Sequence, residues 1–161
     1  RETARPDAAR TDGRGYGRCN CRSGKESVYV IALDTNVIIR FLVRDDEPQA
    51  QAVYARFRQA EGDRETLFVP SLVLLEVIWV LGSAYGKSRP EILDSIEDMK
   101  RMPILTFEKD EAVQAFLVDG RKSKADLADI LIAHSALESG CEEGITFDKK
   151  AARLAFFRVL S

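Results

Sequence analysis

An apolar run that ends in an acid constrains this chain more than any other feature. Residues 28–33 (Val-Tyr-Val-Ile-Ala-Leu) lead directly into Asp34, Thr35 and Asn36. A run this short and uninterrupted is typical of a strand buried on both faces within a parallel sheet. Asp34 would then lie at the carboxyl end of that strand, where open α/β sheets place their ligands. Asp34 could equally serve as the N-cap of the helix that residues 37–42 predict.

Strands and helices alternate along the rest of the chain. Short apolar runs predict strands over residues 67–69, 104–107, 145–147 and 156–160. Helical spacing of apolar residues predicts helices over 48–60, 72–81, 89–100, 108–118 and 126–138. The helix over 72–81 is apolar enough to be largely buried, with Ser71 as its N-cap, and the next one begins with a capping box at Ser88. This alternation implies a three-layer α/β/α fold around a central, mostly parallel sheet of four or five strands.

The first 27 residues differ in composition from the rest of the 161-residue chain. Residues 1–27 are rich in Arg, Gly, Asp and Ser, and they hold seven basic and four acidic residues. We expect a disordered extension or a start-site artefact there, and a folded domain over residues 28–161. The folded part then holds 17 basic and 22 acidic residues, so no basic excess points to nucleic acid.

Composition also limits the cellular setting. The chain is 45% hydrophobic and 31% charged, as is typical of a globular protein. Its longest apolar run is too short to span a membrane, so no membrane association is expected. The three cysteines are odd in number, which argues against a disulfide framework and predicts a reducing compartment such as the cytoplasm.

Four acids are expected to meet at one edge of the predicted sheet. Asp34 and Asp148 follow predicted strands, whereas Glu76 and Asp129 interrupt apolar helices. Four carboxylates in one pocket repel one another unless cations lie between them. Ligation by oxygen alone suits Mg²⁺ or Mn²⁺. Such a site can activate a water molecule and neutralise the charge of a phosphodiester.

Some of these acids also have a purely structural interpretation. Glu76 could be a salt-bridged residue on an exposed helix edge. Asp126 is a good N-cap for the helix that follows it, and Asp129 three residues later could complete a pair resembling a capping box. His134 is the only histidine, and we expect it to be packed or solvated without a catalytic role.

From Val28 to its end the chain resembles the PIN-domain family, and within it the VapC-type ribonuclease toxins. The resemblance rests on four segments in the same order: 32–37 (Ala-Leu-Asp-Thr-Asn-Val), 73–77 (Val-Leu-Leu-Glu-Val), 126–133 (Asp-Leu-Ala-Asp-Ile-Leu-Ile-Ala) and 146–151 (Thr-Phe-Asp-Lys-Lys-Ala). It implies a PIN-like fold and a metal-dependent endoribonuclease that hydrolyses RNA as the toxin of a toxin–antitoxin pair.

The resemblance also implies roles for individual residues. Metal binding and catalysis would fall to a quartet of acids, with Mg²⁺ or Mn²⁺ as the cofactor: Asp34, Glu76, Asp129 and Asp148. Asn36 and Thr146 would support the quartet, and Asp126 resembles an additional acid that some family members carry.

Expected partners follow from the same resemblance. They are an RNA substrate, a cognate antitoxin protein and a second copy of the chain, since apolar residues around Trp79 and Tyr85 suit a homodimer interface. An alternative is a non-catalytic PIN-fold binding module in an antitoxin or RNA-processing complex. A phospho-receiver domain is disfavoured because Asp34 has no neighbouring acid and no strand between Leu67 and Thr106 ends in Asp.

Overall fold

The structure, a computed structural model, describes residues 30–160. The expectations for residues 1–27 and for the first two residues of the first strand therefore lie outside the described residues. The elements in chain order are β1 (Val30–Ala32), α1 (Thr35–Val43), α2 (Glu47–Asp63), β2 (Thr66–Val69), α3 (Ser71–Ser83), α4 (Arg89–Lys100), β3 (Leu105–Phe107), α5 (Asp110–Lys122), α6 (Leu127–Glu138), β4 (Gly144–Thr146), the 3₁₀ helix η1 (Ala151–Arg153) and β5 (Phe157–Val159).

All strand pairs within residues 30–160 are parallel. Strands β1, β2 and β3 form a sheet in that order, with Ile31 opposite Leu67 and Phe68 opposite Thr106. Strands β4 and β5 pair with each other in a second sheet. The predicted α/β class, with a parallel sheet flanked by helices, is confirmed. The five strands form sheets of three and two strands, however, whereas one sheet of four or five was expected, because periodicity locates strands without selecting their partners.

The environment of the first strand differs from the prediction. Val30, Ile31 and Ala32 are all exposed, although their sequence predicted a strand buried on both faces. The reason is the strand order, since β1 forms an edge of its sheet and β2 occupies the centre. Leu67 and Val69 of β2 are completely buried, as the central position requires.

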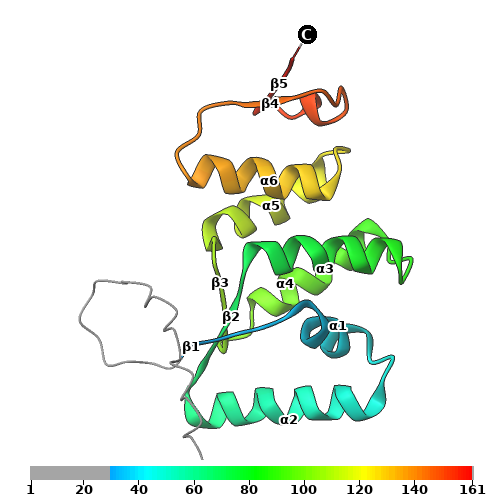
Figure 1. Cartoon of the computed structure of the whole chain (residues 1–161), viewed down its shortest axis with the longest axis vertical. Helices are drawn as coiled ribbons and strands as arrows, with labels where there is room; N and C mark the ends of the chain where they lie inside the picture. The colour runs from blue at the N-terminus through cyan, green and yellow to red at the C-terminus, as the bar shows by residue number, and fades with distance from the viewer. Residues whose placement is uncertain (1–29, 161) are drawn as a thin grey trace, which may run out of the picture.

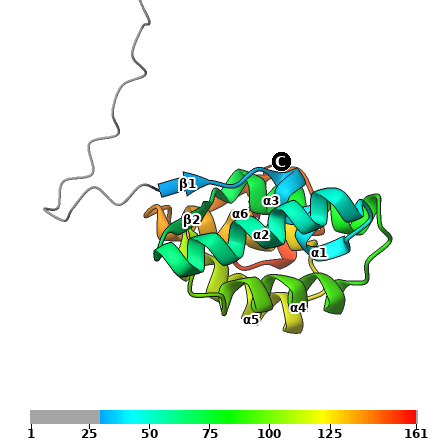
Figure 2. The ribbon, with the colours of Figure 1, turned by 90° about the horizontal axis from the view of Figure 1, so that it is seen from below.

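Helix α3 lies at the centre of the molecule. Figure 1 shows α1 and α2 toward one end of the long axis and α5, α6, β4 and β5 toward the other, with α3 and α4 between them. In the view from below, β1 and the helices α4 and α5 lie on opposite sides (Figure 2). Helix α3 contacts both α1 and α6, so it joins the two ends of the fold.

One continuous apolar core holds these elements together. Its largest fully buried side chains come from six helices and strands and include Ile38, Leu67, Leu74, Leu81, Ile96, Phe116 and Ile130. Helix α3 contributes one buried face to this core, but Leu72, Glu76 and Trp79 on its other face are exposed. The expectation that this helix is largely buried is therefore wrong for the face that carries these three residues. Within residues 30–160, no helix has the length and hydropathy needed to cross a membrane.

Two helix starts illustrate what local sequence can and cannot predict. The capping box of α4 is confirmed, because the backbone N–H and the hydroxyl of Ser88 both donate to Glu91 Oε2, at 2.8 and 2.6 Å. These bonds lower the pKa of Glu91 to about 2. Ser71, by contrast, is the first residue of α3 and not its N-cap, which is Pro70.

A carboxylate from another strand caps α3 instead. The Ser71 N–H donates to Glu108 Oε2 at 2.7 Å, and Glu108 follows β3, the neighbour of β2 in the sheet. The negative charge also suits the positive end of the helix dipole. Hydrogen bonding from Ser71 lowers the pKa of Glu108, so its ionised form is stabilised in the folded protein.

Removing this cap should destabilise the fold. We expect Glu108→Ala to lower the free energy of unfolding at neutral pH by about 1 kcal/mol, and the melting temperature by roughly 2–4 °C for a chain of this size. Since the folded pKa is lowered, the contribution is present above the unfolded pKa of about 4.3 and is lost as the pH falls through the folded value. Thermal unfolding between pH 7 and pH 3 tests this, with Glu61→Ala on α2 as the control. A difference from wild type that persists unchanged at pH 3 would contradict the assignment.

Candidate functional site

The first two acids of the predicted site lie at the start of α1 and in the middle of α3. Asp34 follows β1 and caps α1, and its Oδ1 accepts a hydrogen bond of 3.1 Å from the Asn36 N–H. Thr35 comes next and is only 6% exposed. Its hydroxyl donates to Glu76 Oε2 at 2.5 Å across 41 positions of sequence. The buried hydroxyl of Thr35 therefore holds the Glu76 carboxylate beside the start of α1.

Two further acids lie at the start of α6. Asp126 is the N-cap, as predicted, and its carboxylate accepts a hydrogen bond of 2.8 Å from the Ala128 N–H. Asp129, three residues later, is half-buried. Its neighbours Leu127 and Ile130 pack into the core, so the start of α6 is fixed in place.

The last acid is held in a tight turn after β4. The Asp148 N–H donates to Thr146 Oγ1 at 2.9 Å, and Asp148 Oδ1 accepts from the Lys150 N–H at 2.7 Å. These two bonds fix the backbone on both sides of Asp148. Thr146 thus contacts the backbone of Asp148 and not its carboxylate, so its supporting role for the acids stays a prediction.

Three of the acids share one pocket with four cations. The pocket has a volume of about 510 Å³, and its lining residues are Arg89, Lys124, Ala125, Asp126, Asp129, Asp148, Lys150 and Arg153. Burial raises the pKa of Asp129, and the negative charges of Asp126 and Asp148 raise it further. The ionised form of Asp129 is therefore disfavoured in the folded protein, and a bound cation would relieve this cost.

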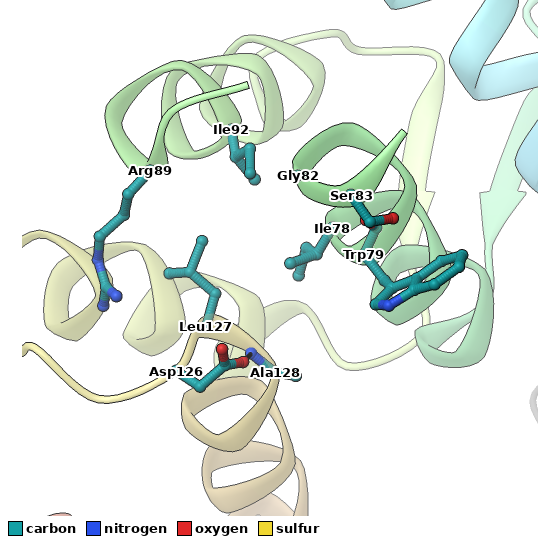
Figure 3. Close-up of a pocket in the computed structure, with 9 residues that line it drawn as sticks. All are labelled: Ile78, Trp79, Gly82, Ser83, Arg89, Ile92, Asp126, Leu127 and Ala128. Carbon is teal, nitrogen blue, oxygen red and sulfur yellow. Dashed lines mark hydrogen bonds between the residues drawn. The ribbon is translucent and has the colours of Figure 1, made fainter. Parts of the chain in front are cut away.

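Arg89 positions this pocket, and the sequence analysis did not identify it. Its guanidinium donates to Gly120 O at 2.7 Å and to Ala125 O at 2.6 Å, and so holds the α5–α6 connection against α4. Arg89 also lines an adjacent pocket of about 330 Å³ between α3, α4 and α6, where Figure 3 shows it with Trp79 and Leu127. A positive charge at the N-terminus of a helix opposes the helix dipole. The position of Arg89 as the first residue of α4 was therefore a signal that its side chain binds to groups outside that helix.

The acids thus form two groups. Asp34 and Glu76 are joined through Thr35, whereas Asp129, Asp126 and Asp148 lie around the pocket. Within residues 30–160, no three or more His, Cys, Asp or Glu side chains lie close enough together to hold a metal ion. Carboxylate oxygens are the donors that a hard cation prefers, so the donor chemistry fits while the spacing does not form a ligand set. The four-acid cage therefore stays a prediction.

The only histidine of the sequence, His134, pairs with an acid outside this set. His134 Nε2 is 2.9 Å from Asp119 Oδ2, which joins α6 to α5. The side chain is half-buried in this pair. This contact agrees with the packed position expected from the sequence.

Comparisons with known proteins point to one family. The family model of the PIN domain matches residues 31–157, a range that contains every acid described above. A VapC ribonuclease from Aquifex aeolicus (strain VF5) is 24% identical over 124 residues, which cover 77% of this chain and 91% of that protein. No solved structure gives a significant match.

The electrostatics of the pocket make a testable prediction. We expect Asp129→Asn to raise the melting temperature of the metal-free protein at neutral pH, because it removes a half-buried charge beside Asp126 and Asp148. A raised folded pKa means that wild-type stability falls as the pH rises through the unfolded and then the folded pKa. The increase in melting temperature caused by Asp129→Asn should therefore be small near pH 3 and largest at pH 7, in buffer containing a chelator.

The matched control is Asp98→Asn, which breaks an exposed ion pair with Arg101. It should leave the melting temperature unchanged or lower it slightly. A melting temperature of Asp129→Asn below that of wild type at pH 7 would contradict the proposed repulsion.

Proposed function

The chain belongs to the PIN-domain family, and from this premise we propose that it is a metal-dependent endoribonuclease of the VapC type, the toxin of a toxin–antitoxin pair. The observation that carries the proposal is the shared pocket of Asp126, Asp129 and Asp148, in which the ionised form of Asp129 is disfavoured. Carboxylates kept together at such a cost are characteristic of functional sites. The similarity to a VapC ribonuclease supports RNA as the substrate.

In this proposal the metal ligands are Asp34, Glu76, Asp129 and Asp148, and the metal is Mg²⁺ or Mn²⁺. A bound divalent cation would supply positive charge that neutralises the phosphodiester and makes an attacking water more acidic. Bringing the two groups of acids into one ligand set requires them to approach each other, and α3 connects them because it packs against both α1 and α6.

Other residues of the chain position the acids. The Thr35 hydroxyl fixes one oxygen of Glu76, and the turn formed by Thr146 and Lys150 fixes Asp148. Arg89 holds the chain segment that leads into α6. Asp126 caps α6 through its carboxylate, and this role suits an acid that adds negative charge to the pocket without binding the metal directly. Asp34 caps α1 in a similar way, because its carboxylate accepts a hydrogen bond from the Asn36 N–H.

The proposed partners are RNA, a cognate antitoxin in the cytoplasm and a second copy of the chain. Trp79 is exposed on α3 and supports the homodimer, since an exposed indole is common at interfaces. Tyr85 gives less support, because its hydroxyl donates to Asp45 Oδ2 at 2.5 Å within the same chain.

A second candidate is a non-catalytic PIN-fold module that only binds a partner. The spacing of the acids favours it, because they do not form a ligand set within residues 30–160. The presence of every acid of the predicted quartet favours catalysis. Cleavage of a mixed RNA pool by the purified chain, with and without Mg²⁺, distinguishes the two candidates.

Replacing single acids tests the proposed reaction. Asp34→Asn and Asp129→Asn should each reduce Mg²⁺-dependent RNA cleavage by more than about 100-fold, beyond the 10–100-fold that residues supporting a ligand contribute. Asn retains the N-cap function at position 34, so the fold is preserved. Cleavage rates on a labelled RNA, with chelated and Glu61→Gln samples as controls, measure the effect. Wild-type rates in both variants would rule out this site.

Thr35 provides a subtler test of the same site. We expect Thr35→Val to lower kcat by roughly 10- to 100-fold, because Glu76 loses the hydroxyl that orients it. Thr35→Ser keeps the hydroxyl and should restore most of the rate. If Val and Ser variants cleave RNA equally well, Thr35 does not act through Glu76.

A further inference from the structure

An exposed aromatic residue immediately precedes one of the residues that line the acid pocket. Phe147 lies in the bend between β4 and η1, and it is 79% exposed. Exposing a large aromatic ring to water is unfavourable relative to burying it, and the bend itself requires no aromatic side chain. The next residue, Asp148, lines the pocket. Phe147 therefore offers an exposed apolar surface one residue away from the pocket lining.

Hydrogen bonds order the backbone around Phe147. The hydrogen bonds from the Asp148 N–H to Thr146 Oγ1 and from the Lys150 N–H to Asp148 Oδ1 hold the chain just after Phe147. Strand β4, which precedes Phe147, pairs with β5. Because the backbone is already ordered on both sides, a ligand that stacks on the ring has little backbone to immobilise.

Cationic side chains border the same pocket. Lys124, Lys150 and Arg153 line it, and none of the three takes part in an ion pair within the described part of the chain. With Arg89 the lining holds four cations and three acids, so it carries a net charge of +1 although the whole chain carries −2. Figure 1 shows β4, β5 and α6 at one end of the molecule.

We propose that Phe147 is a stacking platform for an unpaired RNA base, while Lys124, Lys150 and Arg153 bind the adjoining phosphates. This inference rests on the proposed function and names the part of the site that holds the substrate strand. A ring next to cations is the arrangement with which proteins bind single-stranded nucleic acid, because every base has a face to stack and every nucleotide has a phosphate. A base in a duplex is already stacked, so the site selects single-stranded or looped RNA.

The charges favour RNA over an apolar protein segment as the occupant. Ile145 is also exposed, so an apolar peptide would find some surface here. Such a peptide, however, would bring no negative charge to a pocket whose cations outnumber its acids, whereas a phosphate chain would supply it.

Binding of a fluorescein-labelled single-stranded RNA to the full chain tests the inference. Fluorescence anisotropy in buffer containing a chelator reports affinity without cleavage. Phe147→Ala should weaken binding by roughly 5- to 150-fold, the range for loss of one stacked base, and should leave the salt dependence unchanged. Leu72→Ala, which removes an equally exposed apolar side chain at 79% exposure on α3, should bind as wild type does.

Substitutions of the cations should change the salt dependence of RNA binding. Lys150→Gln and Arg153→Gln should each reduce the slope of log K against log salt by about 0.7, as expected for one lost phosphate contact on a single strand. Arg58→Gln on α2 removes an exposed cation elsewhere and should leave the slope unchanged. Phe147→Trp should keep the affinity, and its added indole fluorescence should be quenched when RNA stacks on it.

Three results would overturn the inference. One is wild-type affinity of Phe147→Ala for single-stranded RNA while wild type binds and cleaves RNA normally, which leaves the proposed function intact. Another is equal affinity of wild type for duplex and single-stranded RNA. The third is an unchanged salt slope in both Lys150→Gln and Arg153→Gln, which would show that neither cation contacts a phosphate. A wild-type chain that neither binds nor cleaves RNA would instead overturn the proposed function and the inference together.

Discussion

The packing of α3 is the constraint on which the candidate site depends. One face of this helix, with Leu74, Val77 and Leu81, is completely buried in the core, and the helix contacts both α1 and α6. Asp34 is the N-cap of α1, and Asp129 lies in the first turn of α6. Because a close-packed core fixes the relative positions of its helices, the burial of α3 determines how near the two groups of acids lie.

Around this scaffold, polar contacts between distant segments place the charges. Thr35 joins α1 to Glu76, Arg89 joins α4 to the α5–α6 connection, and Glu108 caps α3 from the end of β3. Each of these bonds satisfies a backbone or carboxylate group at a helix end or on a helix face. The pocket at the start of α6 then mixes acids and cations, and burial together with the charges of Asp126 and Asp148 disfavours the ionised form of Asp129 there.

The sequence predicted much of the local structure, because local signals lie within a few residues. The capping box of Ser88 and Glu91, the N-cap role of Asp126 and the positions of the helices and strands all follow from such signals. The sequence also identified acids after β1 and β4. The burial predicted from the sequence was wrong for β1 and for one face of α3. Apolar residues are compatible with both buried and exposed positions, and only strand order and helix packing decide between them.

By itself, the sequence determined the family, the order of the acids along the chain and the elements that carry them. Only the tertiary structure decided that the strands divide into sheets of three and two, that Asp126, Asp129 and Asp148 share a pocket with cations, and that Phe147 is exposed. The reason is physical: backbone preferences and caps act over one or two turns, whereas pairing, burial and charge proximity depend on contacts between segments dozens of residues apart.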